Sequence, residues 1–353
     1  MDASETFRDQ LDTAQLDFRS SRAGRVRRCD DPRVSGIGVP DSSRAAPREA
    51  VSPDSNSILS RLYGPIVTPL TQIEEMLRSE LQSPYEDVQA LLRHGVQLGG
   101  KRLRPAVHLL MAEALGGCKP NNLVIGAVLE MVHTATLVHD DVLDDASTRR
   151  HVPTINAQWN NHTSILLGDY LFAQSFRLAA TTDSTRTCQW VGEAARLVCE
   201  GELRQVLFRD DVQIDRETYF EIIQGKTAEL CRVACSLAAA ESGCDSDAID
   251  RLADYGNSLG IAFQIADDYL DLWGDDATVG KTLGTEVEQG KITLPVIRML
   301  ETATDASRDK ILAILRGPVE SRVSLIRPWL ERCDAKDFTV ATARRYKDRA
   351  IAA

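Results

Sequence analysis

The chain has 353 residues, and its 41 Lys and Arg against 52 Asp and Glu give a formal net charge of −11. This negative charge argues against a general nucleic-acid-binding protein, which needs positive charge to replace the counterions of the phosphate backbone. Hydrophobic residues (43%) and charged residues (26%) occur in the proportions of a soluble globular protein with a sizeable core. A local basic pocket for a phosphate-bearing small molecule remains compatible with this balance.

The eight cysteines are scattered along the chain, and no Cys-x-x-Cys pair or histidine cluster accompanies them at zinc-ligand spacing. In a chain of this length, scattered thiols indicate a reducing compartment rather than a disulfide framework, so we expect a cytoplasmic protein. No run of about 18 apolar residues is present, and the sequence therefore predicts no transmembrane segment.

Residues 1–57 differ in composition from the rest, because a cluster of arginines precedes a stretch rich in Pro, Gly, Ser and Asp. Such a segment cannot bury enough apolar surface to offset the entropy lost on ordering it. We expect a disordered N-terminal extension over residues 1–57. A transit peptide is the alternative, although such peptides are poor in acids and this segment has about as many acidic as basic residues.

From residue 58 to residue 353, apolar residues recur at three- and four-residue steps, while strict alternation is scarce. Several periodic stretches would be apolar on most of their helix faces, which is typical of interior helices. The sequence therefore predicts a single all-α domain over residues 58–353, a large helix bundle. The periodic stretches are Val107–Leu115, Ile125–Leu137, Ile165–Leu178, Ala194–Leu207, Tyr219–Ala239, Ile249–Leu272 and Leu294–Leu300.

Two groups of acids follow apolar helical stretches. The first aspartate motif is Asp140, Asp141 and Asp144, and the second aspartate motif is Asp267, Asp268 and Asp271. Residues four apart lie on one face of a helix, so the outer two acids of each motif point the same way. Like charges that close remain ionised only beside a cation. Mg²⁺ prefers hard oxygen ligands and commonly joins protein carboxylates to substrate phosphates, so the pattern predicts a magnesium site.

A solvated helix face or a helix cap is the alternative interpretation, and a single motif of this kind is weak. Asp210, Asp211 and Asp215 nearly repeat the pattern, but no apolar segment flanks them, which indicates an exposed loop before the next helix. Acids placed at the end of an interior helix need a reason, and this favours a functional role for the two motifs.

Basic residues occur beside these acids. Gly99 to Pro105 form a glycine turn that leads into a helix, and the charges of Lys101 and Arg104 together with exposed N–H groups are typical of an anion site. The other basic positions are Arg149, Arg150, Lys226, Lys281 and Lys291. Any one of them alone could be an ordinary surface cation. Together they favour a pocket that binds two diphosphates, one through metal and one directly.

In their order and spacing over about residues 60–345, these motifs closely resemble those of the trans-isoprenyl (polyprenyl) diphosphate synthases. The resemblance implies a large single-domain bundle of the isoprenoid synthase type, with a central cavity, that works as a homodimer. The matching segments are Gly99–Pro105, His133–Asp145 with Arg149 and Arg150, Gly168–Leu171, Gly225–Ala228, Phe263–Asp271, and Gly280–Lys281 through Lys291–Pro295.

The resemblance also implies roles for particular residues. Mg²⁺, as a cluster of three ions, would be held by Asp140, Asp141, Asp144, Asp267, Asp268 and Asp271. The allylic diphosphate would be contacted by Arg149, Lys226, Thr227, Gln264, Lys281 and Lys291. Isopentenyl diphosphate would be bound by Lys101, Arg104, His133 and Arg150. The residues most directly involved in catalysis would be Asp140, Asp144, Asp267, Lys226 and Arg149.

The implied reaction is ionisation of the allylic C–O bond, helped by metal and cations that stabilise the departing pyrophosphate. The double bond of isopentenyl diphosphate then attacks the allylic carbocation, and a proton leaves without any protein nucleophile. Transient membrane contact during product release is compatible with a chain that has no transmembrane segment.

Product length would depend on the residues below the first aspartate motif. Ala135, Thr136 and Val132 lie roughly one to two helical turns before Asp140 and would form the floor of the cavity. Short-chain members of the family often have an aromatic residue at this level, and none is present here. We therefore expect a product of thirty carbons or more, with a geranylgeranyl or farnesyl diphosphate synthase as the alternative; Phe172 or Phe176 could still close the pocket.

Three other protein classes are compatible with part of the pattern. A class I terpene cyclase shares the first aspartate motif but has no second diphosphate to bind, which would leave Lys101, Arg104 and His133 unexplained. A di-iron carboxylate bundle uses the Glu-x-x-His spacing of Glu130 and His133 twice, and this chain has it once. A non-catalytic subunit would be expected to lack acids from one motif, whereas both motifs are complete.

Overall fold

The computed structural model describes residues 61–98, 102–149, 152–274 and 283–353. The predictions for residues 1–57 and for Lys101, Arg150 and Lys281 fall outside these ranges. The chain separates into two compact units, Met1–Thr71 and Gln72–Ala353. Within the described part of the first unit, the short helix η2 (Gly64–Ile66) leads directly into α3 (Val67–Glu80), where Thr71 Oγ1 donates to Val67 O at 3.0 Å.

The second unit is helical almost throughout its described residues, and the all-α prediction is confirmed. Within these residues the strands are β1 (Thr148–Arg149) and β2 (Val152–Pro153), which pair antiparallel. The remaining elements are α4 (Glu86–Leu98), α5 (Leu103–Ala114), α6 (Pro120–Leu143), α7 (Ile155–Gln158), α8 (Asn161–Ala180), α9 (Thr185–Leu207), α10 (Arg216–Ile223), η3 (Gln224–Ala228), α11 (Glu229–Ser242), α12 (Ser246–Trp273), α14 (Thr285–Glu288), α15 (Leu294–Thr302), α16 (Asp305–Leu315), α17 (Val319–Leu330) and α18 (Ala335–Ala352).

The helix ends follow from local chemistry. Pro120 begins α6, where a missing N–H costs nothing because the first turn has no acceptor for it. Asp215 and Asp245 cap α10 and α12 by accepting hydrogen bonds from backbone N–H groups three residues later. Gly243 ends α11 in the left-handed region, with φ of 83°. Most of the periodic stretches lie within helices that extend beyond them at one end or both, whereas Tyr219–Ala239 spans α10, η3 and part of α11.

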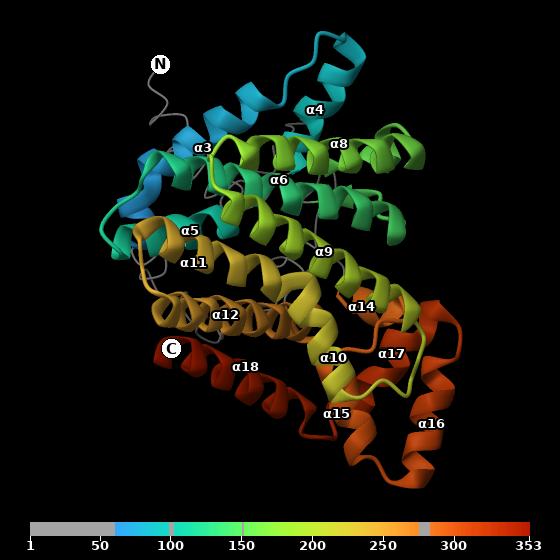
Figure 1. Cartoon of the computed structure of the whole chain (residues 1–353). Helices are drawn as coiled ribbons and strands as arrows, with labels where there is room; N and C mark the ends of the chain where they lie inside the picture. Colours follow the sequence, from blue (N-terminus) through green and yellow to red (C-terminus); the bar gives the residue numbers. More distant parts are fainter. Residues whose placement is uncertain (1–60, 99–101, 150–151, 275–282) are drawn as a thin grey trace, which may run out of the picture. The chain divides into compact units, whose positions relative to one another are not determined.

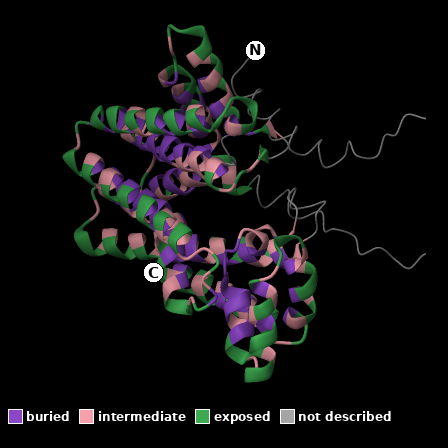
Figure 2. Cartoon of the chain, turned by 90° about the vertical axis from the view of Figure 1, so that its right-hand side faces the viewer, coloured by how far each residue is buried: buried purple, intermediate pink, exposed green. Residues whose placement is uncertain are grey.

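The long helices of the second unit pack in successive layers. Helix α6 packs along α8, α11 packs along α5 and α12, and α12 packs along α18, as Figure 1 shows. Buried residues run along the inner faces of these helices, and another group lies where α10, α12 and α15–α18 meet (Figure 2). Both aspartate motifs lie at the C-terminal ends of long interior helices, α6 and α12.

Helix α6 is, by length and composition, apolar enough to cross a membrane. In this structure 67% of its apolar segment is buried. Its fully buried side chains include Ile125, Leu129 and Val132. Such burial among other helices is what a core helix of a globular domain requires, and it accounts for the apolar composition.

A buried polar network joins α5, α6 and α11. The His108 ring is completely buried; its Nδ1 lies 2.8 Å from Ala234 O, and Asn122 Nδ2 lies 3.1 Å from its Nε2. This arrangement requires a neutral ring with the proton on Nδ1, because Nε2 accepts from the amide. Burial lowers the pKa of His108 from 6.5 to about 4, although the bond to Ala234 acts in the opposite direction.

Because His108 stays neutral in the folded protein, we expect it to make stability fall as the pH drops from 6.5 towards 4. In that range the unfolded chain binds a proton that the folded chain does not, and above pH 6.5 the effect is absent. The loss between pH 6.5 and 5 should be about 2 kcal/mol, at about 1.4 kcal/mol for each pH unit.

Urea unfolding of the wild type and of His108→Gln at pH 7 and pH 5 tests this expectation. Asp268 and Glu202 have raised pKa values and act in the opposite direction, but they are present in both proteins and cancel in the comparison. A stability difference between wild type and variant that does not change with pH would contradict the assignment of a neutral ring.

Candidate active site

The two aspartate motifs lie at the negative ends of helix dipoles. Asp140 and Asp141 are in the last turn of α6, Asp144 is its C-cap, and the second motif is in the last turns of α12. Carboxylates are unfavourable at a helix C-terminus, where the backbone carbonyls already concentrate negative charge. The local structure therefore requires positive charge from other elements.

Three cations from distant parts of the chain supply this charge to the first motif. Lys226 Nζ lies 3.3 Å from Asp140 Oδ2, and Lys291 Nζ lies 2.9 Å from Asp144 Oδ2. Arg209 Nη2 donates to Asp144 Oδ1 at 3.0 Å. Lys226 and Lys291 were predicted as site residues, and the structure places both at the first motif; Arg209 was not predicted.

Asp141 occupies a different environment from Asp140 and Asp144. It is buried, and its Oδ1 accepts hydrogen bonds from Nε and Nη2 of Arg149 at 2.9 and 2.8 Å. Burial raises the pKa of Asp141, an effect that Arg149 opposes. Its second oxygen has no hydrogen-bond partner among the described residues. The structure thus brings two predicted site residues, Asp141 and Arg149, into contact with each other.

The second motif is held by a network within its own half of the unit. Asp268 is buried and accepts hydrogen bonds from Tyr219 Oη at 2.6 Å and Gln264 Nε2 at 2.9 Å. Burial and the nearby Glu286 raise the pKa of Asp268 to about 7. Thr227 Oγ1 donates to Gln264 Oε1 at 2.7 Å, so the predicted residues Thr227, Gln264 and Asp268 form one chain of contacts.

Asp271 fixes the segment that follows α12 in the described structure. Its carboxylate accepts hydrogen bonds from the backbone N–H groups of Thr285 at 3.1 Å and Glu286 at 3.3 Å. Glu286 in turn lies 3.3 Å from Lys291 Nζ, which contacts Asp144. A continuous path of contacts, Asp144 to Lys291 to Glu286 to Asp271, therefore connects the two motifs. Asp267 lies beside them on the exposed side of α12.

A single π-helical turn, η3, presents Lys226 and Thr227 to the site. The turn interrupts an otherwise helical run between α10 and α11, as π turns often do at functional sites. It approaches α9 so closely that a Cβ at Gly201 would lie 2.4 Å from the backbone N of Lys226, and one at Gly225 would lie 2.9 Å from Leu197 O. Only glycine at both positions allows this contact.

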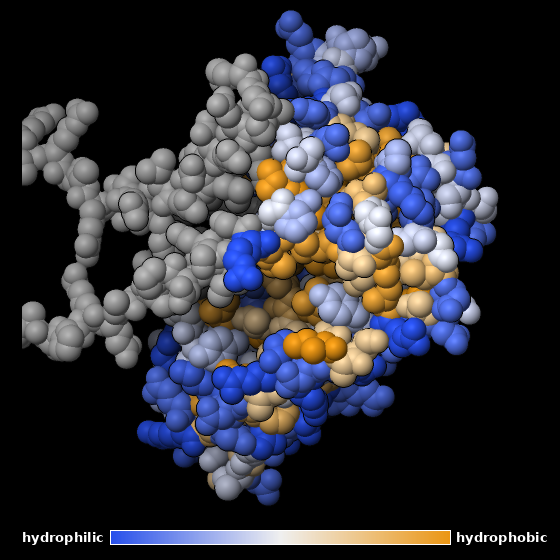
Figure 3. Space-filling view, turned by 90° about the vertical axis from the view of Figure 1, so that its left-hand side faces the viewer, coloured by the Kyte–Doolittle hydropathy of each residue, from blue (hydrophilic) through white to orange (hydrophobic). Residues whose placement is uncertain are grey.

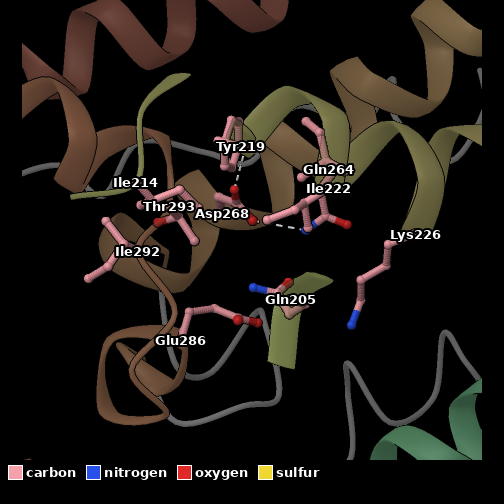
Figure 4. A pocket seen from close by; sticks show the side chains of 11 residues that line it. Gln205, Ile214, Tyr219, Ile222, Lys226, Gln264, Asp268, Glu286, Ile292 and Thr293 are labelled. Carbon is pink, nitrogen blue, oxygen red and sulfur yellow. Dashed lines mark hydrogen bonds between the residues drawn. The ribbon is translucent and has the colours of Figure 1, made fainter. Parts of the chain in front are cut away.

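The residues around η3 enclose a cavity of about 430 Å³, including the part open to solvent. Figure 4 shows Gln205, Glu286, Asp268, Gln264 and Lys226 around it. Dashed lines mark the bonds from Tyr219 and Gln264 to Asp268. The cavity therefore combines Asp268 of the second motif with Lys226, which contacts Asp140 of the first motif.

Lys226 lies between two acids. In addition to Asp140 it contacts Glu202 Oε2 of α9 at 2.8 Å. Burial acts to lower the pKa of Lys226, but Asp140 and Glu202 outweigh it and raise the pKa above its ordinary value. Burial raises the pKa of Glu202 to about 7, against the effect of Lys226. The ammonium thus stays charged and fixed where an anionic ligand of the cavity would meet it.

The predicted isopentenyl diphosphate residues are described in part. Arg104 lies in the first turn of α5, and its Nε is buried with no hydrogen-bond partner among the described residues. His133 lies on α6, two turns before Asp140 and half-buried. Ala135 and Val132 are fully buried, and Thr136 is half-buried. The roles assigned to all these residues stay predictions.

Residues that the sequence interpretation did not assign also lie in the site, among them Glu202, Gln205, Arg209, Tyr219 and Glu286. Gln205 and Glu286 line the cavity, and Glu202 and Arg209 contact Lys226 and Asp144. Glu202 and Gln205 are three apart on α9, the spacing of one helix face, which was an available signal. Arg209 lies beside Asp210 and Asp211, and its role was hidden by the exposed-loop interpretation.

The donor set of the site consists of carboxylates, as a magnesium site requires. Among the described residues, no group of three His, Cys, Asp or Glu side chains could hold a metal by itself. Mg²⁺ is usually bound through one or two carboxylates plus substrate phosphates, rather than by an all-protein cage. The separate acids of the two motifs, connected through Lys291 and Glu286, fit an ion that is shared with a bound diphosphate.

Comparison with known proteins identifies relatives that all belong to one family. Residues 85–329 match the polyprenyl synthetase family. The octaprenyl diphosphate synthase of Escherichia coli is 33% identical over 282 residues, covering 80% of this chain and 87% of that protein. A short chain isoprenyl diphosphate synthase of Methanothermobacter thermautotrophicus is 34% identical over 286 residues, covering 78% and 87%.

Solved structures match over similar lengths. A decaprenyl diphosphate synthase from Rhodobacter capsulatus superimposes with a TM-score of 0.77 at 32% identity, covering 82% of this chain and 90% of that chain. A polyprenyl synthase from Caulobacter crescentus CB15, complexed with calcium and isoprenyl diphosphate, also gives 0.77 at 33% identity, covering 87% and 92%. The fold is thus the all-α fold of the isoprenoid synthases.

Proposed function

The chain belongs to the polyprenyl synthetase family and is a prenyltransferase, and from this premise we propose that it is a magnesium-dependent, long-chain trans-polyprenyl diphosphate synthase. It joins isopentenyl diphosphate head-to-tail to an allylic diphosphate and releases pyrophosphate. The observation that carries this proposal is the path of contacts from Asp144 through Lys291 and Glu286 to Asp271, which connects the two aspartate motifs through Glu286, a residue that lines the cavity.

The outer acids of the two motifs are suited to hold Mg²⁺ against the allylic diphosphate. Asp140, Asp144, Asp267 and Asp271 are the proposed ligands, and the bound metal supplies charge stabilisation for the departing pyrophosphate. Asp141 and Asp268, predicted as ligands too, are held by Arg149 and by Tyr219 and Gln264. We propose that these two fix the ends of α6 and α12, and with them the positions of the outer acids.

The cations of the chain stabilise the charge that develops on the leaving group. Lys226 and Lys291 both contact outer acids of the first motif, and as fixed donors they stabilise the charge of the transition state more than that of the intact C–O bond. Arg104 and His133 are proposed to bind isopentenyl diphosphate, together with Lys101 and Arg150.

Incubation of the protein with labelled isopentenyl diphosphate, Mg²⁺ and each allylic primer tests the function. The expected result is a ladder of elongated prenyl diphosphates ending at thirty carbons or more, with one pyrophosphate released for each condensation. Hydrocarbons formed from the allylic diphosphate alone would instead support a terpene cyclase. Absence of any product with every primer would contradict the proposal.

Product length is proposed to depend on Ala135, Thr136 and Val132 of α6. We expect Ala135→Phe to shorten the product, because a ring at a fully buried position below Asp140 leaves less room for the growing chain. The measurement is chromatography of the reaction products, beside Ala127→Phe, a fully buried alanine two turns further from the site. Equal shortening in both variants, or none in Ala135→Phe, would contradict the assignment of the floor.

A homodimer is proposed to form through the outer face of α8. Ile165, Leu166, Tyr170 and Phe176 are exposed there, and Leu166 alone keeps 68% of its surface accessible. Apolar residues recurring along one exposed helix face are typical of an interface. Hydrophobic residues also gather in the middle of the face that Figure 3 shows, so the dimer interface has to be identified by mutation.

We expect Leu166→Glu to convert the dimer to monomers, measured by light scattering after size-exclusion chromatography. Ile351→Glu is the matched control, because Ile351 of α18 is also a large exposed aliphatic residue. A dimer that survives Leu166→Glu but not Ile351→Glu would place the interface on α18 instead.

We also propose that the protein is located in a reducing cytoplasm. The seven described cysteines, which are all free, support this location.

A further inference from the structure

The loop between α9 and α10 does more than connect two helices. Its first residue after the helix cap, Arg209, donates to Asp144 Oδ1 at 3.0 Å and to Leu143 O at 3.4 Å. The guanidinium still has an unused donor, because its Nε is buried with no hydrogen-bond partner among the described residues. Arg209 therefore contacts the C-terminal end of the first aspartate motif at Asp144, whereas Lys226 of the π turn contacts Asp140.

Asp210 connects this loop to the turn that precedes Lys291 through a hydrogen bond. The backbone N–H of Asp210 donates to Gly290 O at 2.8 Å, and Asp210 itself has a left-handed backbone with φ of 60°. Gly290 also has a positive φ, 74°, and a Cβ there would lie 2.4 Å from Asp210 Oδ1. Because the two turns are fixed to each other, Arg209 and Lys291 reach Asp144 together.

Arg322 of α17 holds this arrangement from outside the site. Its Nη1 donates to Asp210 Oδ1 at 2.9 Å, and its Nε donates to Gly317 O at 3.1 Å. The side chain is only 10% exposed. A left-handed aspartate is strained, and such a conformation persists only where neighbouring contacts determine it. The buried guanidinium is the contact that does so here.

We propose that Arg209 is a further residue that binds the allylic diphosphate, and that Arg322 is a positioning residue that acts on it through Asp210. This inference rests on the proposed function, in which Asp144 holds metal beside the diphosphate. A metal bound to the Asp144 carboxylate competes with Arg209 and Lys291 for its lone pairs and weakens both hydrogen bonds. Arg209 stays fixed by its loop, and its planar donors then face phosphate oxygens, which they match in geometry.

The test compares Arg209→Gln and Arg322→Met with Arg204→Gln. Arg204 is on the same stretch of chain but pairs with Glu221 at the surface, outside the site. Binding of inorganic pyrophosphate with Mg²⁺, measured by calorimetry, should weaken about tenfold to hundredfold in Arg209→Gln, as expected for loss of a charge-assisted hydrogen bond. The KM for the allylic diphosphate should rise by a similar factor, with the KM for isopentenyl diphosphate unchanged.

Arg322→Met should shift the same two quantities in the same direction by a smaller factor, and Arg322→Lys should recover part of the loss because it can still reach Asp210. Arg204→Gln should match the wild type. Unchanged pyrophosphate affinity in Arg209→Gln, or a change only in the KM for isopentenyl diphosphate, would overturn the inference while leaving the proposed function intact. A wild type that binds no pyrophosphate and makes no product would overturn both.

Discussion

Asp140→Ala is expected to lower the turnover of the prenyl transfer by at least about 10³-fold, and Asp267→Ala by a similar factor. Loss of a single fixed donor for transition-state charge typically costs about 10²–10³ in rate, and each of these changes should cost at least as much because it removes a proposed ligand of the metal that stabilises this charge. Because the same charge is needed for every condensation, the loss should be independent of the allylic primer. The measurement is pyrophosphate release under saturating substrates.

The fold should survive Asp140→Ala. The carboxylate contacts Lys226, and Lys226 keeps its second partner, Glu202, after the change. The melting temperature should therefore stay within a few degrees of the wild type. Asp211→Ala is the matched control, since Asp211 belongs to the acid cluster of the α9–α10 loop and its carboxylate accepts only from Gln213 N in the described contacts. Near-normal turnover in Asp140→Ala would defeat the proposed mechanism.

The helices could be predicted well from the sequence, because the buried face of each helix makes apolar residues recur at three- and four-residue steps. Helix α6 was predicted over Ile125–Leu137 and extends over Pro120–Leu143, since its ends carry polar residues that the apolar period does not include. The stretch Tyr219–Ala239 was predicted as one run. It contains the π turn η3, which inserts a residue into the helix without breaking the apolar pattern, so periodicity alone could not reveal it.

The pairing of charges could not be predicted from the sequence. Lys291 and Asp144 are 147 positions apart, and Lys226 and Asp140 are 86 apart, so no local spacing relates them. The acids and bases were recognised as residue types, and the resemblance assigned them to a common site. The contact of Arg149 with Asp141 and the approach of Arg209 to Asp144 depend on how α6, α9 and the hairpin β1–β2 pack, which only coordinates give.

A buried ion triad holds the start of α5, next to the predicted isopentenyl diphosphate residues. Arg102 has a left-handed backbone, with φ of 50°, and forms the N-cap of α5. Its guanidinium contacts both carboxylate oxygens of Glu74, and its Nη1 donates to Glu130 Oε1 at 2.7 Å. Glu130 is almost completely buried, and its Oε2 has no partner among the described residues. Two acids thus depend on one cation.

Arg102→Met is therefore expected to destabilise the protein by about 3–5 kcal/mol, because it leaves two largely buried carboxylates without their counter-charge. Urea unfolding measures the loss. The combined change Arg102→Met, Glu74→Leu and Glu130→Met should recover most of it, since well-packed apolar groups can replace a buried ion network without leaving an unpaired charge. Arg196→Met, which breaks exposed ion pairs with Glu193 and Glu200, is the control and should change stability little. If the triple variant were as unstable as Arg102→Met, the loss would come from packing rather than from uncompensated charge.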